Sequence, residues 1–334
     1  MTSSTALPLA DPALAERIAG RLDLVENRLR DAAAYADELV DNAAHHLADA
    51  GGKRLRPMLT LLAAELGDGE RDEVLAAAVV VELTHLASLY HDDVMDSAPL
   101  RRGAPAAHEV WGNSVAILVG DLLFSRASTT VADLGPEAVK IQAGTFERLC
   151  LGQLHESMGP AEGDDPVQHY LRVLADKTAS LIATSARLGA MYGGCSPETV
   201  ETVAAFGERI GVAFQLADDV IDLSQDGSLS GKTPGTDLRE QVPTMPVLLL
   251  RERAARDGRA EDVALVELLD SDLSDDADLA RAVAALAGHE VVAETRNRAL
   301  SLVAEAVAIL APLPDGPVKA SFISFAEALV NRAS

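Results

Sequence analysis

Almost every segment of this chain is built from residues that favour the α-helix. Alanine, leucine, valine, glutamate and arginine dominate, and no alternating run of β-branched and aromatic residues bounded by turn residues is found. Glycine and proline signals separate the segments, but no break is long or polar enough to be a domain linker. The sequence therefore predicts an all-α protein, a single-domain helical bundle over residues 1–334 in which residues 1–10 form a flexible N-terminal segment.

Charge and composition narrow the classes of function. The net charge is −24, from 28 basic and 52 acidic residues, which argues against nucleic acid as a partner. No secretory signal is present, and no uninterrupted apolar run reaches the roughly 18 residues that cross a membrane. Cys150 and Cys195 suit a reducing compartment, and we interpret both as core residues. These features predict a cytoplasmic protein without stable membrane insertion.

Two aspartate clusters share the spacing D-D-x-x-D, one within His91–Asp96 and the other within Gln215–Asp222. On a helix, the first and last aspartates of each cluster share a face, and the middle one lies about 100° round the axis. Such like charges repel unless a cation binds, and hard oxygen ligands suit Mg²⁺ holding a phosphorylated substrate. One copy alone would be read as a solvated helix face, but the repeat favours a metal site. The predicted metal ligands are Asp92, Asp93, Asp96, Asp218, Asp219 and Asp222.

Three further motifs accompany the two clusters. They are GGKRLRP at Gly51–Pro57, RRG at Arg101–Gly103 and DKT at Asp176–Thr178. With the clusters, and in this order, they make the chain resemble the trans-prenyl diphosphate synthases over Gly51–Pro246. The resemblance implies the all-α isoprenoid synthase bundle with a central active-site cavity, a homodimer, and Mg²⁺ as cofactor with three ions in each site.

The chemistry that the resemblance implies is a head-to-tail condensation. An allylic diphosphate (geranyl, farnesyl or geranylgeranyl) ionises, the C3=C4 double bond of isopentenyl diphosphate attacks the cation, and proton loss leaves a chain one isoprene unit longer. Diphosphate departs readily only when its developing charge is neutralised by metal ions and cationic side chains. This requirement explains why acidic clusters and basic motifs occur together.

The resemblance also implies a role for individual residues. Asp92, Asp96 and Asp218 coordinate Mg²⁺ directly, whereas Asp93, Asp219 and Asp222 support them or hold the water shell. Arg101 contacts the allylic diphosphate, and the pocket for isopentenyl diphosphate consists of Lys53, Arg56, His85 and Arg102. Lys177, Thr178 and Gln215 lie beside the leaving group. Lys232 covers the second cluster when its loop closes, unless it merely keeps that loop soluble.

Two motifs depart from the family pattern. Where relatives often have E-G-K-x-T-L-P, this chain has Glu240–Pro246, so that Val242 replaces a lysine and one phosphate contact is in doubt. Gln153 and Glu156 stand where relatives have a glutamine and an acid on a helix that lines the cavity. Glutamate in place of aspartate keeps the charge at this position but lengthens the side chain.

Small side chains before the first cluster indicate a long product. Ala87 and Ser88, five and four residues before Asp92, are too small to close an apolar tunnel, and Thr84 lies one turn further. Each cleared turn of 5.4 Å admits about one more isoprene unit, which predicts a product of about C30 to C50 such as a quinone side chain. Phe146 is the candidate deep stop, with ordinary core packing as the alternative.

Two other functions compete with this reading. A class I terpene cyclase shares the bundle and the first aspartate cluster, but cyclases commonly guide carbocations with aromatic faces, and only 3% of this chain is aromatic. A non-catalytic subunit of a heteromeric synthase would be expected to lack one cluster or the Lys177–Thr178 pair, and all of these are intact.

Overall fold

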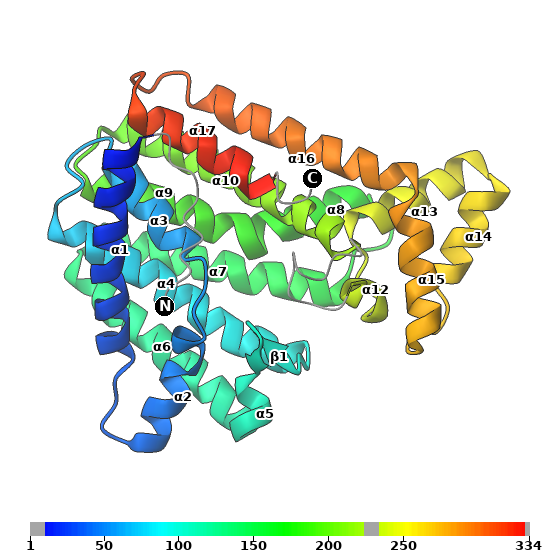
Figure 1. The fold of residues 1–334 in the computed structure, drawn as a ribbon, viewed down its shortest axis with the longest axis horizontal. Helices are drawn as coiled ribbons and strands as arrows, with labels where there is room; N and C mark the ends of the chain where they lie inside the picture. Colours follow the sequence, from blue (N-terminus) through cyan, green and yellow to red (C-terminus); the bar gives the residue numbers. More distant parts are fainter. Residues whose placement is uncertain (1–10, 224–233, 331–334) are drawn as a thin grey trace. The chain divides into compact units, whose positions relative to one another are not determined.

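The computed structural model describes residues 11–223 and 234–330, which are almost wholly helical (Figure 1). This confirms the prediction of an all-α protein. The predicted N-terminal segment 1–10 and Lys232 lie outside the described residues. Contacts divide the chain into two compact units, the first comprising residues 1–149, 180–208 and 309–325 and the second residues 150–179, 209–308 and 326–334. The single domain over the whole chain stays a prediction.

The first unit is built around one buried helix, α4. This helix packs against α1, α3, α6 and α9, and nearly every side chain from Val74 to Ala87 is buried. A helix that is apolar on all sides belongs in the middle of a bundle. The elements of this unit are α1 (Pro12–Ala33), α2 (Glu38–Asp49), α3 (Leu55–Ala64), α4 (Asp72–Met95), β1 (Leu100–Arg101), β2 (Ala104–Pro105), α5 (Ala107–Trp111), α6 (Asn113–Asp133) and α9 (Ser180–Tyr192).

The second unit contains shorter helices, in which α13 packs against α8 and α14, and α15 against α12 and α14. They are α8 (Pro166–Leu174), a π-helical turn η1 (Ala175–Ala179), α12 (Thr236–Arg239), α13 (Met245–Asp257), α14 (Ala260–Leu269) and α15 (Asp276–Ala287). Four longer helices have residues in both units: α7 (Pro136–Met158), α10 (Pro197–Asp222), α16 (Glu290–Ile309) and α17 (Pro317–Val330).

Part of the acidic excess is used to begin helices. Four N-cap aspartates accept hydrogen bonds from backbone N–H groups of the first turn, and such a cap contributes about 1 kcal/mol. These caps are Asp11 of α1, Asp37 of α2, Asp165 of α8 and Asp275 of α15.

Two local features differ from the sequence predictions. The β1–β2 hairpin was not expected; its turn residues Arg102 and Gly103 have φ values of 55° and 78°, and positive φ at both central positions is typical of a tight hairpin turn. The interpretation of both cysteines as core residues was wrong, because Cys150 is exposed and Cys195 only partly buried. The buried residues of α7 recur every three or four positions, as at Thr145, Leu149 and Gly152, and Cys150 lies off that face.

Two described helices, α4 and α6, are long and apolar enough to cross a membrane by length and composition alone. Within their most apolar stretches, 72% of the α4 residues but only 33% of the α6 residues are buried in the protein. Burial of this kind in α4 is what a core helix shows. The prediction of no membrane insertion stays a prediction.

Candidate active site

The first aspartate cluster lies at the C-terminal end of α4. Asp92 is partly buried, Asp93 is fully buried, and Asp96 is exposed at the C-cap. Asp93 Oδ1 accepts a hydrogen bond from Arg101 Nε at 2.6 Å and forms an ion pair with Arg101 Nη2 at 2.5 Å. Burial raises the pKa of Asp93, while the Arg101 guanidinium opposes that rise. Through Arg101, Asp93 links the β1–β2 hairpin to α4, while Asp92 and Asp96 remain the more accessible carboxylates.

Three basic residues, Arg56, His85 and Arg102, form a cluster beside these aspartates. Burial lowers the pKa of Arg56 to about 10, with Arg102 adding to the effect and the carboxylates of Glu82 and Asp92 opposing it. Burial, and then the nearby Arg56 and Arg102, lower the pKa of His85 well below its usual value. The structure therefore places these three predicted residues close enough together for their charges to interact.

The backbone of the GGKRLRP segment and of the residues before it holds Arg102 of this basic cluster. Arg102 Nη1 donates to the carbonyl of Leu47 at 2.9 Å and also to that of Gly51. A Cβ atom on Gly52, where φ is 148°, would lie 2.9 Å from Arg102 Cζ. The absence of a side chain at Gly52 therefore lets the Arg102 guanidinium lie against the loop. Lys53 is exposed in the same loop.

A buried ion-pair network holds this loop, and the sequence reading missed it. Arg54 has φ 47° and donates from Nη1 to Glu82 at 2.8 Å, from Nη2 to Glu26 at 3.2 Å and from Nη2 to the Ala48 carbonyl at 2.9 Å. Glu82, on α4, is only 2% exposed. The available signal was its position in the apolar run Val81–Leu83, since a glutamate in a core needs a cationic partner.

The second cluster, at the end of α10, also combines buried and more accessible carboxylates, although here the last aspartate is buried. Asp219 is 2% exposed and accepts from the Tyr170 hydroxyl at 2.8 Å and from the Met245 amide at 3.1 Å. Asp222 is buried, and its Oδ2 accepts from the Asp237 amide at 3.3 Å. Asp218 is only partly buried. Burial raises the pKa of Asp219 to about 8. Asp219 and Asp222 face the protein, which leaves Asp218 as the most accessible carboxylate.

The predicted leaving-group residues occupy the π-helical turn η1. Lys177 Nζ forms an ion pair with Glu156 of α7, and Thr178 Oγ1 donates to Gln215 Oε1 of α10 at 3.3 Å. Single π turns inside helices are frequent at functional sites. The structure thus brings Lys177, Thr178 and Gln215 together with Glu156. Nearby, the side-chain oxygen of Gln153 is buried and has no hydrogen-bond partner.

The chain-length candidates lie in the first unit. Ala87 and Thr84 are each 1% exposed on α4, and the Thr84 hydroxyl is satisfied by the Val80 carbonyl at 2.8 Å. Ser88 is partly buried and donates to the His85 carbonyl. The Phe146 ring centroid lies 3.7 Å from that of Phe124 on α6. Phe124 was not identified from the sequence, because its partner is distant in the chain.

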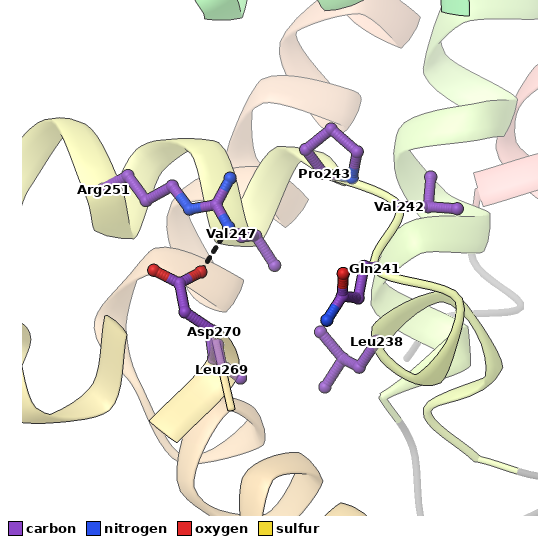
Figure 2. A pocket seen from close by; sticks show the side chains of 8 residues that line it. All are labelled: Leu238, Gln241, Val242, Pro243, Val247, Arg251, Leu269 and Asp270. Carbon is purple, nitrogen blue, oxygen red and sulfur yellow. Dashed lines mark hydrogen bonds and ion pairs between the residues drawn. The ribbon is translucent and has the colours of Figure 1, made fainter. Parts of the chain in front are cut away.

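Val242 and Gln241 border a cavity of about 150 Å³ in the second unit (Figure 2). Gln241 stands where the family pattern has glycine, and its φ of 56° explains why a glycine suits this position. On the other side of the cavity, Arg251 and Asp270 form an ion pair at 2.6 Å. The cavity contains none of the predicted metal ligands, so we do not assign it to the reaction.

The carboxylates of the aspartate clusters are hard oxygen ligands, which suit Mg²⁺. Within residues 11–223 and 234–330, no three His, Cys, Asp or Glu side chains form a ready metal site. Mg²⁺ commonly binds through one or two carboxylates together with water and substrate phosphates, so it does not require a complete protein cage. Asp93 Oδ2 is also buried without a hydrogen-bond partner. A cation held by Asp92 and Asp96 with a diphosphate fits this donor set.

An all-α fold with two D-D-x-x-D clusters and a cluster of basic residues beside the first is typical of helical enzymes that act on prenyl diphosphates. The family model for polyprenyl synthetase matches residues 37–286. A nonaprenyl diphosphate synthase from Mycobacterium tuberculosis is 41% identical over 325 residues, covering 97% of this chain and 96% of the relative.

Solved structures agree with this match. Geranylgeranyl pyrophosphate synthase from Corynebacterium glutamicum, complexed with calcium and isoprenyl diphosphate, has a TM-score of 0.86 and 38% identity over 98% of this chain and 99% of its own. A polyprenyl synthase from Caulobacter crescentus, with the same ligands, has a TM-score of 0.87 and 30% identity over 96% and 97%. The chain belongs to the polyprenyl synthetase family, and it is a prenyltransferase.

Proposed function

We propose that this protein is a Mg²⁺-dependent synthase that condenses isopentenyl diphosphate with an allylic diphosphate to give a linear all-trans polyprenyl diphosphate of about C30 to C50. The observation that carries the proposal is the presence of two D-D-x-x-D clusters together with the Lys177–Thr178 pair in one chain of this family. The Mycobacterium tuberculosis relative, which is named for a nonaprenyl product, supports the long-chain assignment.

The basic cluster of Arg56, His85 and Arg102 is assigned to the pocket for isopentenyl diphosphate. The guanidinium groups of Arg56 and Arg102 offer planar, bidentate hydrogen bonding to phosphate oxygens, and Lys53 adds a point charge. His85 enters this pocket neutral, because its pKa lies well below the usual value, and can donate one N–H to the diphosphate.

The acidic clusters and Arg101 are assigned to the allylic diphosphate. Asp92, Asp96 and Asp218 would hold Mg²⁺, with three ions in each site, and the supporting carboxylates are Asp93, Asp219 and Asp222. Bound Mg²⁺ supplies Lewis acidity that neutralises the departing diphosphate. Arg101 contacts the same diphosphate and is oriented by Asp93.

The π turn is assigned to the breaking C–O bond. Lys177 neutralises charge on the leaving diphosphate, and the oxygens of Thr178 and Gln215 turn lone pairs towards the allylic cation. After the double bond attacks, the liberated diphosphate accepts the proton. Lys232 is assigned to covering the second cluster, although it lies outside the described residues.

The product tail is assigned to the side of α4 that carries Ala87, Ser88 and Thr84, with Phe146 as the deep stop. We further propose a homodimer in the cytoplasm whose product serves as a quinone side chain. Exposed apolar side chains on α5 and α6 support the dimer, namely Val110 (49% exposed), Ile117 (42%) and Leu118 (60%).

The test is incubation of the purified protein with farnesyl diphosphate, labelled isopentenyl diphosphate and Mg²⁺, followed by chain-length analysis of the dephosphorylated products. A ladder that ends in one linear alcohol longer than about C25 is expected, given one isoprene unit per cleared helical turn. Diphosphate release with a cyclic hydrocarbon and no isopentenyl incorporation would identify a cyclase. A complete lack of turnover would favour a non-catalytic subunit.

A further inference from the structure

The π turn η1 is packed between two glycines from different helices. Gly152 of α7 and Gly211 of α10 are both buried. A π turn inserts one extra residue into a helix and survives only where its surroundings hold it. The two glycines therefore affect the positions of Lys177 and Thr178.

On the α7 side, the backbone of Lys177 rests against Gly152. A Cβ atom on Gly152 would lie 2.5 Å from the Lys177 nitrogen and 2.9 Å from its Cα, closer than real Cβ atoms come. Glu156 lies four residues later on the same face of α7 and forms the ion pair with Lys177 Nζ. One face of α7 thus contacts both the backbone and the side chain of Lys177.

The α10 side repeats this arrangement. A Cβ atom on Gly211 would lie 2.5 Å from Ala179 Cα and 2.6 Å from Ala179 Cβ. Gln215, four residues later on α10, accepts the hydrogen bond from the Thr178 hydroxyl at 3.3 Å. Each helix therefore provides a glycine for close approach and, one turn on, a polar side chain that orients a residue of the π turn.

We propose that Gly152 and Gly211 are positioning residues that seat the π turn, so that Lys177 and Thr178 are held at the ionising diphosphate. The inference rests on the proposed function of that pair. A side chain at either glycine displaces the turn by the distance that the added Cβ requires. A shift of about 1 Å in groups aligned with a reacting bond can cost about 100-fold in rate.

The chain offers a matched control on each helix. Gly144 of α7 has nothing within 4 Å of its Cβ position, so Gly144→Ala tests the loss of a glycine alone. Gly207 of α10 lies one turn before Gly211, and its Cβ would lie 2.6 Å from Ala183 Cα, so Gly207→Ala creates an equal clash away from the π turn. These variants separate a positioning effect from a general packing effect.

The experiment measures kcat, the KM for isopentenyl diphosphate, the rate of allylic diphosphate ionisation, and the midpoint of thermal unfolding. Gly152→Ala and Gly211→Ala are expected to lower the ionisation rate and kcat by about 100-fold, with a KM within about twofold of wild type. Gly144→Ala and Gly207→Ala are expected to retain kcat, although Gly207→Ala unfolds at a lower temperature. Equal losses of kcat in Gly207→Ala and Gly211→Ala, or unchanged kcat in both π-turn variants, would overturn the inference.

If the two glycine variants do not fold, Glu156→Gln tests the inference in their place. This substitution keeps the shape of the side chain and removes its charge. A drop in kcat of about tenfold or more, with an unchanged midpoint of thermal unfolding, supports the proposed positioning of the π turn, since one charge-assisted hydrogen bond to Lys177 is lost. An unchanged kcat overturns it. A wild-type protein that fails to incorporate isopentenyl diphosphate would instead refute the proposed function, which the same assay shows separately.

Discussion

At the scale of single residues, identical side chains have different surroundings. Asp93 and Asp219 are buried and bonded within the protein, to Arg101 in one case and to Tyr170 and the Met245 amide in the other. Asp92 and Asp218 are only partly buried. The D-D-x-x-D spacing therefore combines carboxylates that fix the local fold with carboxylates that can reach a metal ion.

This difference predicts opposite effects for neighbouring residues. Asp219→Ala leaves the buried Tyr170 hydroxyl and Met245 amide without their acceptor, and we expect it to lower the free energy of unfolding by about 2 to 4 kcal/mol. Asp218→Ala should change stability by less than about 1 kcal/mol but lower kcat by about 1,000-fold or more, because metal-assisted ionisation is lost. Urea unfolding and steady-state kinetics check both. An Asp218→Ala protein that is as unstable as Asp219→Ala would contradict the assignment.

His85 makes stability depend on pH. In the folded protein its pKa is lowered by burial and then by the nearby Arg56, Arg102, Arg101 and Arg54. Below pH of about 6.5 the unfolded chain therefore binds a proton that the folded protein does not, and stability falls as pH falls.

The corresponding variant is His85→Gln, which removes this group. Between pH 6.5 and 5.5 the wild type should lose about 1 kcal/mol more than the variant, measured by urea unfolding at each pH. Equal losses in the two proteins would show that His85 is protonated when folded.

At the scale of secondary structure, the sequence predicts what depends on local pattern. The end of α4 could be predicted because an apolar helical run leads directly into the spacing of Asp92 and Asp96. The π turn could not, because it depends on Gly152 and Gly211 from two other helices. The hairpin was missed because each strand has only two residues, and its turn is stabilised by a hydrogen bond from Arg102 to the distant Leu47 carbonyl.

On the proposed function, product length depends on α4 and the helices packed on it. Ala87→Phe places an aromatic ring on the buried face five residues before Asp92, and we expect it to shorten the product to about C15 or C20 while turnover continues. Phe146→Ala should lengthen the product instead. Product chain lengths from the farnesyl diphosphate assay test both changes. If Ala87→Phe only destabilises the protein by about 1 to 3 kcal/mol, as overpacking does, the chain does not extend along this face.

In the molecule as a whole, net charge and exposed apolar surface have opposite effects on the association of copies. A net charge of −24 favours separation of copies, whereas the large apolar side chains that α6 exposes favour association through a partner surface. Burial of apolar area contributes about 25 cal/mol per Å², so a patch of this kind can outweigh screened repulsion between like charges. This balance predicts that association persists at physiological salt and weakens at low salt.

The test of association uses two leucines on different helices. Leu118 on α6 is 60% exposed and Leu300 on α16 is 44% exposed. Sedimentation of the wild type should give twice the chain mass of 35.0 kDa. Leu118→Asp should shift the protein towards the monomer, because a buried aspartate without a partner costs several kcal/mol, while Leu300→Asp leaves the mass unchanged. A monomeric wild type would refute the homodimer, and a dimer that survives Leu118→Asp would place its interface away from this face of α6.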